Sequence, residues 1–81
     1  MAAKAKKRTI AAFGVEFDRE VDGRWIAEIP KLPGVMAYGS TKAEARRKAY
    51  VIALRTLAES VEQGSTPAPV ARLFQYGMAR R

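Results

Sequence analysis

Two runs of alternating apolar and polar residues meet at Asp22-Gly23, and this junction constrains the fold more than any other feature. In Thr9–Glu20 the apolar side chains recur at every second position from Phe13 to Phe17, and Arg24–Ile29 alternates in the same way. A period of two predicts strands with one buried face. An Asp-Gly pair between two such runs is among the stronger hairpin signals. We therefore expect two antiparallel strands.

A turn and a third strand follow. Pro30–Gly34 cannot continue a strand inside a sheet, because neither of its prolines can donate a ladder hydrogen bond. Pro33-Gly34 suits the centre of a type II turn, after which Val35–Gly39 is expected as a short strand. Leu32 has two open interpretations, a residue folded back onto the core or an exposed loop residue.

One long helix is expected after the third strand. Thr41 as N-cap with Glu44 three residues later makes a capping box, and Gly64 is placed to end the helix after Gln63. Six residues at helical spacing predict its buried stripe: Ala49, Tyr50, Ala53, Leu54, Leu57 and Val61.

The last element is less strongly specified. Val70 to Tyr76 is predicted as a fourth short strand, although Leu73–Tyr76 fits a helical turn almost equally well. The expected fold class is therefore α+β, a single β-β-β-α-β domain with a mostly antiparallel sheet. A right-handed crossover would place the last strand beside the first and give the sheet order 3-2-1-4. One helix covers one face of such a sheet and leaves the other face open.

Composition limits the chemistry that the chain can perform. Its 81 residues allow one domain with a thin core, which predicts a homo-oligomer, a dimer or a tetramer. Cysteine and histidine are absent, so no thiolate nucleophile, imidazole base, transition-metal site or cofactor is expected. The sequence has no run of about 18 apolar residues, so no membrane span is expected. The basic N-terminus lacks the apolar stretch of a secretory signal. We expect a cytoplasmic protein that is not an enzyme.

The net charge of +7 resides in the ends of the chain. Lys4, Lys6, Lys7 and Arg8 lie in a predicted flexible arm, residues 1–8, and Arg80 and Arg81 add two more charges. Removing these six from the fifteen basic residues leaves nine against eight acidic ones in the domain, residues 9–79. The domain is thus nearly neutral, and contact of the arm with nucleic acid would be weak, salt-dependent and non-specific.

Four carboxylates are the most informative polar side chains. Glu16, Asp18 and Glu20 alternate along the first strand, and Glu28 on the second strand can join them on the open face. Two-metal hydrolysis would need such carboxylates around ions roughly 4 Å apart, but no base supports that chemistry here. The alternatives are a solvated polar face, an oligomer contact, or an acidic patch that attracts a basic partner.

Apolar contacts are predicted on two elements. Met36 and Tyr38 are the candidates on the third strand, on the side away from the helix. Val51 and Ile52 lie outside the helical stripe and are either a second contact or part of a wide stripe that reaches the sheet edge. Trp25 shares a strand face with Ala27 and Ile29, so a core position under the helix is favoured over an interface. A basic cluster begins the helix and is either solvated or a contact for an acidic partner: Lys42, Arg46, Arg47 and Lys48.

The segment Asp22–Ala45 carries a resemblance to a known family. Its turn Pro30-Lys31-Leu32-Pro33-Gly34 leads through a short strand and Gly39-Ser40-Thr41 to Glu44-Ala45 at the start of a long helix, and Ala53–Glu59 continues the pattern. The chain resembles the HicB family of small bacterial and archaeal antitoxins over roughly Phe13 to Gly64. Members often carry a C-terminal DNA-binding module, and this chain, which ends at Arg81, is expected to be a short form without it.

The resemblance implies a partial ribonuclease-H-like fold without nuclease activity. It also implies an antitoxin of a type II toxin-antitoxin system, which neutralises a small basic HicA-type mRNA-cleaving toxin by occlusion. The basic ends of the chain oppose association with a basic toxin. Two alternatives therefore stay open, a solitary HicB-like oligomer without a toxin and an accessory nucleic-acid-binding protein that acts through its basic tails.

Overall fold

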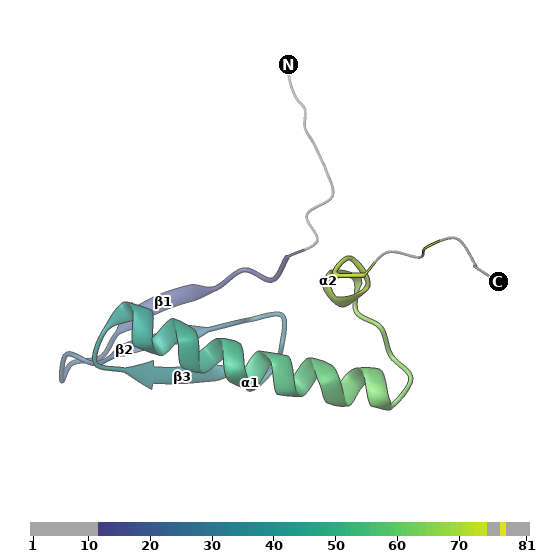
Figure 1. Cartoon of the computed structure of the whole chain (residues 1–81). Helices are drawn as coiled ribbons and strands as arrows, with labels where there is room; N and C mark the ends of the chain where they lie inside the picture. Colours follow the sequence, from purple (N-terminus) through teal and green to yellow (C-terminus); the bar gives the residue numbers. More distant parts are fainter. Residues whose placement is uncertain (1–11, 75–76, 78–81) are drawn as a thin grey trace, which may run out of the picture.

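The computed structural model describes residues 12–74 and 77. Its elements are β1 (Glu16–Arg19), β2 (Trp25–Glu28), β3 (Met36–Gly39), α1 (Lys42–Glu62) and α2 (Ala68–Ala71). The strands form one antiparallel sheet in the order β1-β2-β3, and α1 runs along one face of it (Figure 1). The predicted α+β class, the three strands and the single long helix are confirmed.

The first hairpin closes on Asp22-Gly23 as predicted. The amide of Gly23 donates to the Glu20 carbonyl at 2.9 Å, and the amide of Glu20 donates to the Arg24 carbonyl at 2.7 Å. Gly23 has φ 93°, a left-handed conformation that glycine adopts without the steric cost of a Cβ. A three-residue loop that ends in a left-handed residue is a common hairpin connection.

The second connection is the predicted type II turn. Gly34 has φ 84°, and the amide of Val35 donates to the Leu32 carbonyl at 3.0 Å. A further bond from the Ile29 amide to the Val35 carbonyl, at 3.0 Å, ties the two ends of the loop together. Leu32 is only 9% exposed, so it folds back onto the core.

Helix α1 begins with the predicted cap, with one difference in its partner. The Glu44 amide donates to Thr41 Oγ1 at 3.0 Å. The carboxylate of Glu44 reaches one residue further back than expected and accepts from the Ser40 amide at 2.7 Å and from the Ser40 hydroxyl at 2.8 Å. The bond to Thr41 satisfies a donor that the first turn of a helix leaves unpaired, and the two bonds from Ser40 hold the residue that precedes the cap.

The core lies between α1 and the strands β2 and β3, on which the helix mainly packs. Nine residues are buried: Ala27, Ile29, Leu32, Val35, Ala37, Ala45, Ala49, Ala53 and Leu57. Five of the nine are alanines, so the helix and the sheet approach closely but little apolar volume is enclosed. Phe13, Val15, Phe17, Trp25 and Val70 pack against this cluster and are only partly buried.

Half of the predicted helical stripe is wrong. Tyr50, Leu54 and Val61 are 46%, 60% and 44% exposed. The reason is the position of α1, which covers β2 and β3 and leaves the flank of the helix toward β1 without a layer beneath it.

The predicted fourth strand is also wrong in the part of Val70 to Tyr76 that the structure describes. Val70 and Ala71 belong to α2, and the Leu73 amide donates to the Val70 carbonyl at 3.0 Å in a turn. Pro69 lies in the first turn of α2, where its fixed φ and missing N–H are tolerated. In the described residues the sheet therefore ends at β1, and the order 3-2-1-4 is not seen. Gln75 and Tyr76 lie outside the described residues.

Candidate protein-binding surface

The face of the sheet opposite α1 carries the predicted contact residues in two cross-strand rows. Glu16 pairs with Glu28 and Glu28 with Met36, whereas Asp18 pairs with Ile26 and Ile26 with Tyr38. Because residues directly opposite in adjacent strands share a face, all six side chains belong to one surface. We call this surface the open face. It brings together the predicted residues Glu16, Asp18, Glu28, Met36 and Tyr38, to which the register adds Ile26.

The carboxylates of the open face are uncompensated within residues 12–74 and 77. The two ion pairs found there are Arg24 with Asp22 and Lys48 with Glu44, and neither includes a carboxylate of the open face. Glu16 lies directly opposite Glu28, an arrangement of like charges that destabilises a strand pair. Asp18 accepts one hydrogen bond, from the Arg19 amide at 2.7 Å. The arrangement creates a negative potential that favours a cation on this side of the sheet.

An aromatic contact limits the acidic character to one end of the open face. The Arg24 guanidinium lies 4.5 Å from the ring centroid of Tyr38, and its Nε is 2.9 Å from Asp22 Oδ2. The hydrogen bond from the Arg24 amide, followed by its guanidinium, lowers the pKa of Asp22. Arg24 and Asp22 neutralise each other, so Tyr38 lies beside a balanced pair while the row of Glu16 and Glu28 is purely acidic.

Met36 and Tyr38 remain 39% and 38% exposed, and both are apolar over much of their surface. Methionine and tyrosine are enriched at protein interfaces, where they supply contact area that charged side chains do not. The open face thus combines carboxylates with apolar side chains. Such a surface can bind a protein that presents basic and apolar groups together.

Trp25 lies on the other side of the sheet, as predicted, but it is only half-buried. The Arg19 guanidinium lies 4.9 Å and the Lys42 ammonium 5.6 Å from its ring centroid, and Lys42 is also 4.8 Å from the ring of Phe17. These cation–π contacts, two of them from the first residue of α1, cover the aromatic rings at this edge of the core. They give Trp25 a structural role.

The basic cluster of α1 is partly used within the chain. Lys42 covers Phe17 and Trp25, and Lys48 Nζ lies 3.6 Å from Glu44 Oε2. Arg46 and Arg47 are exposed and make no ion pair among the described residues. Lys42 and Lys48 are therefore used in contacts within the chain, and among the described residues Arg46 and Arg47 are the members of the cluster without an ion-pair partner.

Val51 and Ile52 are 40% and 37% exposed, as predicted. They lie on α1, on the far side of the sheet from the open face, so no single partner surface joins all seven predicted contact residues. Reasoning from the sequence missed an apolar groove between α1 and the chain that enters β1, lined by Phe13, Val15, Tyr50, Leu54 and Leu57 among others. The width of the predicted helical stripe could have indicated this groove, because two strands do not cover a stripe that includes both Tyr50 and Leu54.

Within the described residues no three acidic side chains are close enough to hold a metal ion. In the same part of the chain no helix is long and apolar enough to cross a membrane. Lys4, Lys6, Lys7, Arg8, Arg80 and Arg81 lie outside the described residues.

Comparisons with protein-family models, with curated proteins and with solved structures found no match to the chain.

Proposed function

We propose that this protein is an antitoxin-like binding protein that neutralises a small basic HicA-type mRNA-cleaving toxin by occlusion. The open face is the contact surface. The observation that carries this proposal is the uncompensated pair Glu16 and Glu28 with Asp18 beside it. A basic partner would relieve the repulsion between the two glutamates, and it would be steered toward them before contact.

The identity of the partner rests on the resemblance to the HicB family. The order of three antiparallel strands followed by one long capped helix, with the turn at Pro30–Gly34, is the arrangement that this resemblance implies. The partial ribonuclease-H-like fold belongs to the same proposal. Support for a protein partner is independent of the resemblance, because exposed Met36 and Tyr38 next to carboxylates suit a protein surface better than a phosphate backbone.

The net charge of the chain does not describe the charge of the open face. Of the fifteen basic residues, six lie in residues 1–8 and 80–81, outside the described residues, and the open face itself carries three carboxylates. Within the described residues these carboxylates have no ion-pair partner. They would therefore attract a basic toxin at short range, where salt screens charges least.

The test is affinity capture of the tagged full chain from its native host, with and without nuclease treatment. We expect a nuclease-resistant partner that is smaller than 100 residues, basic, and toxic when expressed alone. Recovery of nucleic acid alone would overturn the proposal in favour of the basic tails, and recovery of the chain alone would leave a solitary oligomer.

The captured toxin then tests the surface. Glu16→Lys with Asp18→Lys should slow association by roughly tenfold or more at low salt and flatten its salt dependence. The matched control is made one charge at a time. Glu16→Lys alone should slow association, whereas Glu59→Lys on α1, seven residues after Ile52 and away from the open face, should change the rate far less. Equal rates for these two single variants would remove the open face from the proposal.

A further inference from the structure

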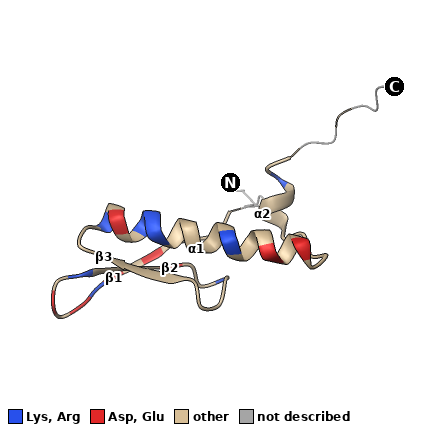
Figure 2. Cartoon of the chain, turned by 60° about the horizontal axis from the view of Figure 1, so that its bottom comes forward, with Lys and Arg blue, Asp and Glu red and all other residues tan. Residues whose placement is uncertain are grey.

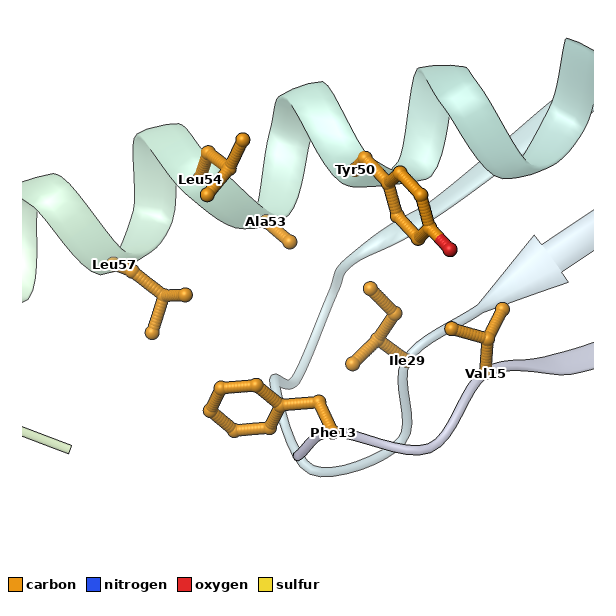
Figure 3. A pocket seen from close by; sticks show the side chains of 7 residues that line it. All are labelled: Phe13, Val15, Ile29, Tyr50, Ala53, Leu54 and Leu57. Atoms are coloured by element: carbon orange, nitrogen blue, oxygen red, sulfur yellow. The ribbon is translucent and has the colours of Figure 1, made fainter. Parts of the chain in front are cut away.

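Among residues 12–74 and 77, the flank of α1 that faces β1 is an apolar surface with no element packed on it. Tyr50, Leu54 and Val61 are exposed along it, and Arg47 shares their side of the helix because it precedes Leu54 by two turns. Phe13 and Val15, just before β1, face this flank across an open groove (Figure 3). The groove has a volume of about 270 Å³ and no charged residue in its lining.

The groove continues along α1 toward its C-terminal end. A second hollow of about 330 Å³ shares Leu54 and Leu57 with the first and adds Val61 from the last turns of the helix. Three residues of α2 and the turn after it form its other wall: Val70, Leu73 and Phe74. Leu73 and Phe74 are 70% and 72% exposed. Together the two hollows extend along more than half of the 21-residue helix, from Tyr50 to Val61.

The thin core explains why this surface needs cover. None of the larger side chains of the described residues is fully buried, and most of the buried residues are alanines. Small domains bury a small fraction of their surface and are therefore only marginally stable. Contiguous exposed apolar patches usually mark an interface.

The charges of α1 identify an occupant. Its N-terminal half is rich in lysine and arginine, and its last two turns carry Glu59 and Glu62 (Figure 2). Arg47 lies seven residues before Leu54 and Glu62 lies eight residues after it. A second α1 that packs antiparallel across Leu54 would therefore place each Arg47 near the partner's Glu62, while the two apolar flanks meet.

We propose that this groove is the interface of a two-fold symmetric dimer, in which α1 packs antiparallel against α1 of a second copy with Leu54 at the axis. The two-fold axis makes the surface self-complementary, so one apolar flank and one charge gradient serve both copies. Phe13 and Val15 form one rim of the interface, and Leu73 and Phe74 form the other. The proposal does not depend on a toxin, because the open face lies on the other side of the sheet.

Sedimentation equilibrium of the full chain tests the assembly. We expect a species of twice 8.9 kDa that dissociates on dilution. Leu54→Ser should weaken the dimer by about a hundredfold, because each dimer loses two leucines at its axis. Ile52→Ser is the matched control on the opposite flank of the same helix and should leave the dimer intact. A wild-type chain that stays monomeric, or two variants with equal effects, would overturn the proposal.

Two further variants test the geometry even if a serine at Leu54 impairs folding. The chain has no cysteine, so Leu54→Cys introduces a single thiol, and oxidation should link two copies at the axis, whereas Ile52→Cys should not. Arg47→Glu and Glu62→Arg should each weaken the dimer, and the double variant should restore it. Linkage through Ile52→Cys alone, or failure of the double variant to recover, would exclude the antiparallel arrangement.

Discussion

Gly39 is the position where the fold tolerates least change. A Cβ placed there would lie 2.5 Å from the Ala45 backbone nitrogen and 3.0 Å from Ala45 Cα. Both atoms belong to the first turns of α1, so no side-chain rotation can relieve the contact. Gly39 does not have a positive φ, and alanine is compatible with its strand conformation. The expected cost of Gly39→Ala is therefore steric alone.

The magnitude follows from the distance that must be recovered. Ordinary contact begins at 3.4 Å, so the start of α1 would have to move away from β3 by about 0.9 Å. This movement would also separate Ala45 and Ala49, both 0% exposed, from the sheet beneath them. Overpacking of a core costs about 1–3 kcal/mol. In a domain of this size a loss of about 2 kcal/mol lowers Tm by roughly 8–16 °C.

Urea unfolding followed by the fluorescence of Trp25, the only tryptophan, measures this loss. Gly14→Ala is the matched control, because a Cβ at Gly14 meets nothing within 4 Å, and it should be neutral or slightly stabilising. All samples need the same protein concentration, since dimerisation would contribute to stability. If Gly39→Ala unfolds within about 0.5 kcal/mol of Gly14→Ala, the close approach of helix and strand is not what fixes this glycine.

Three other outcomes are expected. Thr41→Ala removes the acceptor for the Glu44 amide and should lower the free energy of unfolding by about 1 kcal/mol in urea titrations; an unchanged value would show that the cap is dispensable. The hydrogen bond from the Ser40 amide, then the one from the Ser40 hydroxyl, and then the charge of Lys48 lower the pKa of Glu44 from its ordinary value of 4.5. The ionised carboxylate of Glu44 therefore stabilises the folded protein above pH 4.5, and this stabilisation is lost as the pH falls through the folded-state pKa. The difference in stability between wild type and Glu44→Gln should therefore be seen at neutral pH and disappear in acid, and a difference that persists in acid would assign it to another cause. Leu54→Ser should bind a captured toxin at the wild-type rate, and a slower rate in stopped-flow mixing would show that the two surfaces are coupled.

Local signals in the sequence were sufficient to predict the turns and the start of the helix, because the backbone requires particular residue types there. Asp22-Gly23 placed the hairpin, Pro33-Gly34 placed the type II turn, and Thr41 with Glu44 placed the start of α1, because each depends on neighbours within four residues. The alternation of side chains along a strand also predicted that Glu16, Asp18 and Glu28 share one face, since this alternation does not depend on the rest of the fold.

The errors concern relations between elements that are distant in sequence. The helical period identified an apolar side of α1 but not the angle at which that side meets the sheet, so Tyr50 and Leu54 were assigned to the core and are exposed. Val70 to Tyr76 was predicted as a strand, with a helical turn almost equally possible for Leu73–Tyr76. In the structure Val70 lies in α2, and Pro69 favours the first turn of that helix.

Both uncovered surfaces have one geometrical cause. Three strands about 4.8 Å apart are wider than one helix about 10 Å across can cover fully, so α1 packs mainly on β2 and β3 and leaves the inner side of β1 only partly covered among the described residues. The opposite face of the sheet has no layer at all among the described residues. The two surfaces nevertheless differ in chemistry, because the groove beside β1 is lined without a charge while the open face carries three carboxylates. Under the two proposals, a second copy of the chain occupies the apolar groove and a basic partner occupies the open face, so the two surfaces would bind different proteins.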